Sequence, residues 1–175
     1  VEEVIRIVGF DHIPSAPLPR TPGVAKPTAT PQQLVERKMR RAAAAAGLNE
    51  AVTWSFIAPA QAALVGGGAW SVANPISEEM KAMRPSLLPG LLAATQRNLD
   101  RGASSIRLFE IGRRYLADAE RPTLALVLAG DRTPRGWQGG KAQGFDAFDA
   151  KAAVIALLAA AGAPVPAPCR RPPPP

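Results

Sequence analysis

The side chains that most often carry out catalysis are few in this chain and stand apart from one another. The single histidine, His12, lies in a proline-rich connector, and the single cysteine, Cys169, lies in a proline-rich tail. Neither has a partner at a spacing that would activate a nucleophile. Three consecutive glycines at 66–68 lack the lysine and the serine or threonine that complete a phosphate-binding loop. We therefore expect no catalytic residue of these kinds in the chain.

Asp146 and Asp149 lie three residues apart and could suggest a pair of general acids and bases. They stand just before a predicted helix at 152–161, however. An aspartate in that place serves well as an N-cap, because its side-chain oxygen accepts hydrogen bonds from free backbone N–H groups of the first turn. We expect Asp149 to be the N-cap and the pair to have no catalytic role.

The composition predicts a folded domain, and because the chain has no initiator methionine we expect it to be a piece of a longer protein. Of the 175 residues, 47% are hydrophobic, which excludes general disorder. The 21 Lys and Arg exceed the 14 Asp and Glu, and the net charge of +7 suits a polyanionic partner such as RNA, although basic surfaces are common without that function. One cysteine forms no intramolecular disulfide, which fits a reduced, cytoplasmic setting. No signal peptide is visible, and the longest apolar run, 152–163, is too short to cross a bilayer.

The stretch at 74–115 contains the clearest elements of the chain. Four residues share one stripe at the helical period, Leu88, Leu92, Thr95 and Leu99. Gly102 is placed to end that helix. The segment 106–115 then reads as a strand, and apolar residues on both of its faces predict a central place in a sheet. Glu110 lies within this strand, so we expect its carboxylate to be paired or hydrogen-bonded and its role to be structural.

Further elements lie on either side of this stretch. Thr30, Pro31 and Gln33 form a helix-start pattern for a helix at 31–46, which carries basic residues on one side. The segment 50–56 reads as a strand because it is β-branched and aromatic. A short helix at 59–65, an apolar strand at 123–129 and a glycine-rich loop at 130–144 are also expected.

The run NPISEEMKAMRPSLLPGLL, followed by RLFEIGRRY, closely resembles the β subunit of bacterial phenylalanyl-tRNA synthetase. The resemblance implies an α+β fold like that of class II aminoacyl-tRNA synthetases, with an antiparallel β-sheet flanked by helices. It implies three parts: the end of a preceding helical module with a connector at 1–20, a synthetase-like core domain at 21–163, and a proline-rich tail at 164–175. This core would be non-catalytic.

The class II motifs give this resemblance its functional content. The motif 2 arginine that holds the α-phosphate falls on Leu116, which cannot bind phosphate, so the fragment is expected to be inactive and catalysis to lie in the α subunit. The helix at 31–46 and the strand after it resemble motif 1, an element of subunit interfaces. The resemblance implies five interface residues, Val35, Met39, Arg40, Arg41 and Trp54.

The resemblance also implies cofactors and partners. In the family, the paired glutamates at Glu2 and Glu3 contribute to a magnesium site with two upstream aspartates, so the site is incomplete here and no metal is expected in the fragment. Alternatively, both glutamates have only a structural role, because negative charges in the first turn of a helix are stabilised by the helix dipole. The whole enzyme would use ATP and magnesium, contain the α subunit in an α2β2 assembly and bind tRNA, without a membrane. Two rival functions remain open: an RNA-binding module that uses the basic helix face, and a stand-alone ATP-dependent ligase, which Leu116 disfavours.

Overall fold

The computed structural model describes residues 2–19, 23 and 27–164, and the chain divides into a unit at 1–30 and a unit at 31–175. In the first unit, helix α1 (Glu2–Val8) is followed by the short 3-10 helix η1 (Phe10–His12), and neither contains a buried residue. Gly9, with φ at +104°, separates them in a conformation that suits glycine. The expected tail lies, apart from Pro164, outside the described residues.

A long β-hairpin is the centre of the second unit. Strand β4 (Ser105–Tyr115) pairs antiparallel with β5 (Glu120–Thr133) along its whole length. Two short strands complete the sheet: β1 (Asn49–Glu50) pairs parallel with β4, and β6 (Gln143–Gly144) pairs antiparallel with β5. The order β1-β4-β5-β6 confirms that the strand predicted at 106–115 is internal to the sheet.

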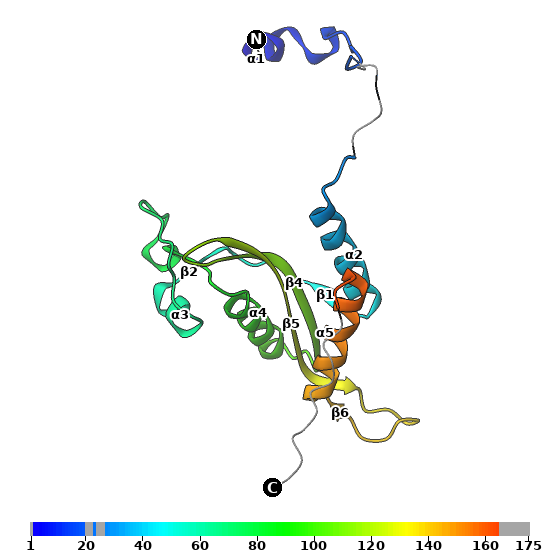
Figure 1. Cartoon of the computed structure of the whole chain (residues 1–175). Helices are drawn as coiled ribbons and strands as arrows, with labels where there is room; N and C mark the ends of the chain where they lie inside the picture. The colour runs from blue at the N-terminus through cyan, green and yellow to red at the C-terminus, as the bar shows by residue number, and fades with distance from the viewer. Residues whose placement is uncertain (1, 20–22, 24–26, 165–175) are drawn as a thin grey trace. The chain divides into compact units, whose positions relative to one another are not determined.

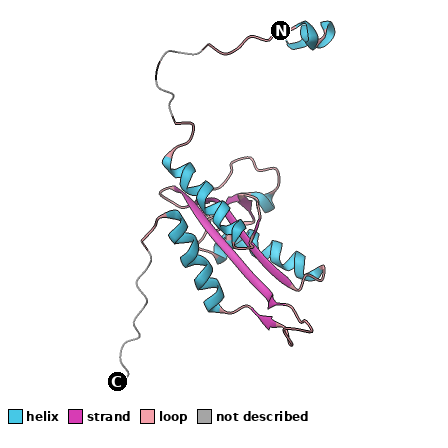
Figure 2. Ribbon diagram, turned by 90° about the vertical axis from the view of Figure 1, so that its right-hand side faces the viewer, coloured by secondary structure: helices cyan, strands magenta, loops and turns pink. Residues whose placement is uncertain are grey.

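Helices cover both faces of the hairpin (Figures 1 and 2). Helices α2 (Pro31–Ala45) and α5 (Ala147–Ala161) pack on one face, around the buried residues Ala43, Leu48, Phe109 and Leu157. Helix α4 (Leu88–Asp100) covers the other face and buries Leu91 and Thr95. Alternation along β4 explains this arrangement, because successive side chains of a strand point to opposite faces. The predicted helix at 88–99, followed by Gly102 at φ +87°, is confirmed.

A smaller layer lies beyond the end of the hairpin. Strands β2 (Phe56–Ile57) and β3 (Ala82–Met83) pair antiparallel. Helix α3 (Pro59–Leu64) packs near them, and the 3-10 helix η2 (Glu78–Met80) lies between β2 and β3 in the sequence. Ile57, Ala62 and Ala82 form its small core.

Three sequence expectations about elements need correction. The strand predicted at 50–56 is interrupted: β1 ends at Glu50, β2 begins at Phe56, and 51–55 forms no regular strand. Asp146, not Asp149, is the N-cap of α5, which begins at Ala147 rather than 152. Asp149 sits at N3 of the same capping box, because its carboxylate accepts a bond from the Asp146 N–H. The apolar strand extends beyond 123–129 on both sides, since β4 supplies pairing partners for 120–122 and 130 and β6 pairs with Asp131 and Thr133.

None of the helices in the described ranges has the length and apolar character that crossing a bilayer requires.

Candidate functional site

A buried ion pair joins the segment before α4 to the middle of β4. Arg84 Nη1 lies 2.7 Å from Glu110 Oε1, and the two residues are 4% and 2% exposed. Arg84 Nε also donates to the Arg113 carbonyl at 2.9 Å. The prediction that Glu110 is paired is therefore confirmed. Breaking such a pair by removing one partner is strongly destabilising, because the other charge is left buried without compensation.

Thr53 is the third member of this cluster. Its backbone N–H donates to Glu110 Oε1 at 3.3 Å, and its hydroxyl donates to Glu110 Oε2 at 2.7 Å. Arg84 Nη1 donates to the Thr53 carbonyl at 3.3 Å and to its hydroxyl at 2.9 Å. On the far side, a Cβ at Gly90 would collide with the Thr53 hydroxyl. Thr53 is thus held by hydrogen bonds to side chains although it belongs to no strand. We call Thr53, Arg84 and Glu110 the Thr53 cluster.

Apolar side chains next to the Thr53 cluster are exposed to solvent. Val52 is 90% exposed, Trp54 74%, and Ile76 fully exposed. A cavity of about 400 Å³ is lined by Trp54, Phe56, Val72, Asn74, Pro75, Ile76 and Met80. We call the group Val52, Trp54, Phe56, Ile76 and Met80 the Trp54 surface. Contiguous exposed apolar residues of this kind mark a contact surface for another molecule.

Helix α2 and the residue after it carry an apolar stripe, Val35, Met39, Ala42 and Ala46, that the structure buries only in part. At its C-terminal end, Ala43 is fully buried and Ala42 packs against the same core. At its N-terminal end, Val35 remains 36% exposed, and Met39 is half-buried. Ala46 is exposed, so the stripe packs on the chain's own sheet only near Ala42.

The basic residues of α2 are placed differently from one another. Arg40 Nε lies 2.7 Å from Glu50 Oε1 in β1, whereas Arg41 is exposed. Of the five expected interface residues, four lie on α2 and Trp54 lies in the segment at 51–55; Arg40 is bound to Glu50 of β1, the strand that precedes this segment.

The position expected for a phosphate-binding arginine does not fit ATP. Leu116 is half-buried, and its N–H donates to the Ala119 carbonyl at 2.9 Å. Nearby, the Arg113 guanidinium lies 3.5 Å from both Glu36 and Glu120. Its charge is compensated by carboxylates of its own chain, so it is poorly placed to receive a phosphate. The expected inactivity of the fragment stays a prediction.

Glu2 and Glu3 do not by themselves fit a magnesium site. Both are exposed on α1, and Glu2 Oε1 lies 3.3 Å from Arg6 Nη2. The described residues contain no group of three or more His, Cys, Asp or Glu side chains placed to hold a metal. Magnesium requires near-octahedral oxygen ligands, and two carboxylates, one of them bound to an arginine, supply too few.

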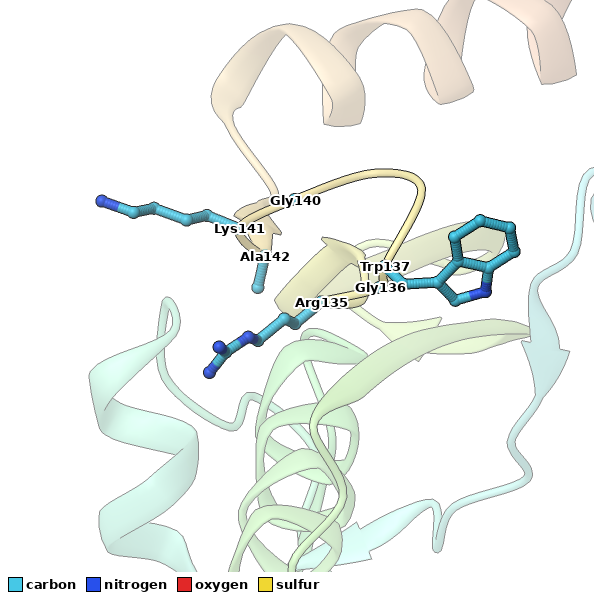
Figure 3. A pocket seen from close by; sticks show the side chains of 6 residues that line it. All are labelled: Arg135, Gly136, Trp137, Gly140, Lys141 and Ala142. Carbon is cyan, nitrogen blue, oxygen red and sulfur yellow. The ribbon is translucent and has the colours of Figure 1, made fainter.

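A second exposed tryptophan lies at the tip of the β5–β6 hairpin. Trp137 is 93% exposed, and the loop borders a cavity of about 740 Å³. Its ring points away from the side chains of Arg135 and Lys141, which extend to the other side of the loop (Figure 3). The base of the hairpin is held by Arg132, which binds Asp149 at 3.1 Å and Gln143 at 2.8 Å.

Hydrogen bonds at the base of the hairpin lower the pKa of one carboxyl group, that of Asp149. The hydrogen bond from the Asp146 N–H, followed by the bond to Arg132, holds the pKa of Asp149 below its usual value of 3.8. Both interactions favour the charged carboxylate over the protonated form. The capping-box hydrogen bond is thus itself the main reason why the charged form of Asp149 is favoured.

Sequence reasoning found Glu110 but missed Thr53 and Arg84. Arg84 carried a usable signal, because it stands in the otherwise apolar context of Ala82, Met83, Pro85 and Leu87. A lone cation in such a stretch predicts a buried charge that needs a partner. Thr53 carried none, since threonine is common in strands.

Comparisons with known proteins agree with this geometry. The chain matches the family described as the phenylalanyl tRNA synthetase beta chain CLM domain over residues 13–170. It is 68% identical over 172 residues to a phenylalanine–tRNA ligase beta subunit of Novosphingobium aromaticivorans, covering 94% of this chain and 22% of that protein. The corresponding protein of Zymomonas mobilis is 62% identical over 165 residues, with 94% and 21% covered. The chain thus spans about a fifth of the length of these relatives.

Solved structures show the same fold at low identity. The pyrrolysyl-tRNA synthetase of Desulfitobacterium hafniense superposes with a TM-score of 0.57 at 21% identity, over 74% of this chain and 47% of that one. An ATP phosphoribosyltransferase regulatory subunit/histidyl-tRNA synthetase from Bacillus halodurans C gives 0.54 at 18% identity, over 85% and 39%. The expected synthetase-like α+β fold, an antiparallel sheet flanked by helices, is confirmed.

Proposed function

The chain belongs to the family of phenylalanyl-tRNA synthetase β chain CLM domains, and we propose that it docks the α subunit of a phenylalanine–tRNA ligase through its Trp54 surface. The name shared by its relatives, beta subunit, implies an α partner. The observation that carries the proposal is the group of exposed apolar side chains around Trp54, beside a cavity of about 400 Å³.

The composition of this surface suits a protein partner. Binding energy at interfaces is concentrated in a few central residues, among which tryptophan is enriched. A second cavity, of about 300 Å³, also involves Trp54, Phe56 and Met80, and its border includes the charged residues Glu79 and Arg97. An apolar centre with charged residues at its border is the usual anatomy of an interface between proteins.

Helix α2 would contribute a second contact by its exposed N-terminal half. Val35, Met39 and Arg41 remain candidate interface residues there, in line with the resemblance to motif 1. Arg40 is a poorer candidate, because Glu50 of its own chain already compensates its charge at 2.7 Å. Arg41 is therefore the better residue on which to test this helix.

The proposal extends to the whole enzyme. The complete β subunit would support the ATP- and magnesium-dependent attachment of phenylalanine to tRNA in the cytoplasm, with catalysis in the α subunit of an α2β2 assembly. This segment would act by structuring the heterodimer, since Leu116 stands where a phosphate-binding arginine is expected. The lack of adenylate formation by the isolated segment is part of the same proposal.

Substitution of Trp54 tests the docking surface directly. In a full-length β subunit mixed with its α subunit, Trp54→Ala should weaken assembly by about 30-fold or more, the effect of losing an interface hot spot. Sedimentation over a range of subunit concentrations measures this affinity. The matched control is Trp137→Ala, which removes an equally large exposed side chain elsewhere. If both variants assembled like the wild-type protein, the Trp54 surface would not be the contact.

An RNA-binding module on α2 is the alternative function. The exposed basic residues of this helix, Arg37, Lys38 and Arg41, support it. Two contacts count against it: Arg40 is paired with Glu50, and Glu36 on the same helix binds Arg113. RNA affinity that fell steeply with salt and was reduced by Lys38→Glu would favour this alternative over docking.

A further inference from the structure

We propose that Arg84 and Glu110 are positioning residues for subunit docking, and that they act through Thr53 to hold Trp54 in its binding conformation. The inference rests on the proposed docking function and adds a mechanism to it. Neither residue is on the Trp54 surface, since both are almost completely buried. Their effect on a partner would therefore pass entirely through the segment at 51–55.

Alternate residues of this segment are anchored inward. The Ala51 N–H donates to the Phe109 carbonyl at 2.7 Å, and the Arg84 N–H donates to the Ser55 carbonyl at 2.9 Å. Between them, Thr53 is bound by both members of the ion pair. Val52 and Trp54, the residues in between, are the ones exposed to solvent. The segment thus presents its apolar side chains as a strand would, while side chains rather than a partner strand bind its middle.

The anchors are bound to the central hairpin of the domain. Glu110 lies in the middle of β4, and Arg84 is bound to the end of that strand by its Nε and by its carbonyl, which accepts from the Tyr115 N–H at 2.9 Å. Gly90 of α4 closes the opposite side of Thr53. A side chain whose backbone is held in this way loses little conformational freedom on binding, which favours affinity.

The use of an ion pair, rather than apolar packing, supports a positioning role. A buried ion pair adds little stability over well-packed apolar residues of similar volume. Apolar residues, however, cannot bind the N–H, the carbonyl and the hydroxyl of one threonine, as Arg84 and Glu110 do. The distinguishing property of the pair is therefore the orientation it imposes on residue 53.

Two variants of the full-length β subunit separate positioning from stability. Thr53→Val keeps the shape of the side chain but removes the hydroxyl that binds both charged groups. Arg84→Met/Glu110→Leu replaces the pair with apolar residues of similar length and avoids an unpaired charge. Thr53→Ser, which keeps the hydroxyl, is the conservative control. Thermal unfolding establishes that each variant is folded.

The measurements are affinity for the α subunit and hydrogen exchange of the segment at 51–55. We expect Thr53→Val and the double variant to weaken assembly by about tenfold, the effect of losing hydrogen bonds to charged groups. Hydrogen exchange of the backbone amide of residue 53 should accelerate in both variants. The affinity of Thr53→Ser for the α subunit should stay within about twofold of the wild-type affinity. On a Trp54→Ala background, Thr53→Val should have almost no further effect, because the two changes act on one contact.

The outcomes distinguish this inference from the docking proposal. If Trp54→Ala weakened assembly while folded Thr53→Val and the double variant bound normally, docking would stand and positioning would be wrong. Additive effects of Thr53→Val and Trp54→Ala would also overturn positioning. If Trp54→Ala itself had no effect, the docking proposal would fail, and this inference with it. Restored ligase activity of Thr53→Val at saturating α subunit would support a defect in assembly, not in catalysis.

Discussion

Trp54 and Trp137 are both highly exposed, but their backbones are held in different ways. Trp54 follows a residue bound by a buried ion pair, in a segment attached to Phe109 of β4 at one end and to the Arg84 N–H at the other. Trp137 stands in a loop that contains Gly136, Gly139 and Gly140, around which a Cβ would meet no other atom within 4 Å. Exposure alone therefore does not distinguish a preorganised contact from a free loop, whereas the backbone anchors do.

The two regions also differ in how their charged side chains are placed. The cations beside Trp137, Arg135 and Lys141, have no salt bridge among the described residues, whereas Arg84 near Trp54 is buried and paired. A solvated charge contributes little to stability, but a buried one makes its partner indispensable. Substitutions should thus have large effects near Trp54 and small effects near Trp137.

The largest expected effect comes from removing one member of the ion pair. Arg84→Met should lower the free energy of unfolding by about 3–5 kcal/mol, because Glu110 is left buried and unpaired. Denaturation of the 175-residue chain with urea measures the change. The control is Arg135→Met at the hairpin tip, which should stay within about 0.5 kcal/mol. Equal effects of the two variants would contradict the contrast drawn between the regions.

Glycine substitutions should separate the regions by a smaller amount. Gly90→Ala should destabilise by about 1–3 kcal/mol, because the new methyl group would collide with Thr53. Without that contact, alanine would stabilise a helix by about 0.5–1 kcal/mol, so the sign itself is informative. Gly136→Ala should be nearly neutral, since its φ is not positive and its surroundings are open. If Gly90→Ala instead raised the urea midpoint, the backbone of α4 at residue 90 would not be in close contact with the Thr53 side chain.

Loss of the α5 cap tests whether the base of the hairpin matters for docking. Asp146 accepts from the Phe148 N–H at 2.8 Å and from the Asp149 N–H at 2.9 Å. Asp146→Ala should lower the free energy of unfolding by about 1 kcal/mol, as for other N-cap losses. Affinity of the full-length variant for the α subunit should not change. Weaker assembly, measured by sedimentation, would show that α5 and the hairpin also take part in docking.

The smallest expected effect is the pH dependence contributed by Asp149. Its pKa is lowered in the folded state, so its contribution to stability is present above the usual value of 3.8 and is lost as the pH falls through the folded-state pKa. Asp149→Asn should therefore destabilise the chain at neutral pH and flatten the decline of stability below about pH 4. Urea midpoints measured from pH 7 to pH 3 check this. An unchanged pH profile would mean that neither the Asp146 N–H nor Arg132 stabilises the charged carboxylate.

Local patterns determined much of this fold from sequence alone. The stripe from Leu88 to Leu99 predicted α4, and the residues at 106–115 predicted β4 and its internal place in the sheet. These predictions succeeded because helical and strand periods are properties of neighbouring residues. Glu110 was expected to be paired for a similar reason, since a carboxylate within a strand that is apolar on both faces needs a partner wherever that partner lies.

Tertiary contacts decided the site itself. The segment at 51–55 has the composition of a strand, yet Thr53 is bound by Arg84 and Glu110, which lie 31 and 57 residues further along the chain. Likewise, the stripe on α2 could have faced either the chain's own sheet or a partner, and the packing of Ala43 and Ala42 with Phe109 and Leu157 turns this part of the helix to the chain's own sheet. Such choices depend on which distant side chains meet in the folded chain, and that is a property of packing rather than of local sequence period.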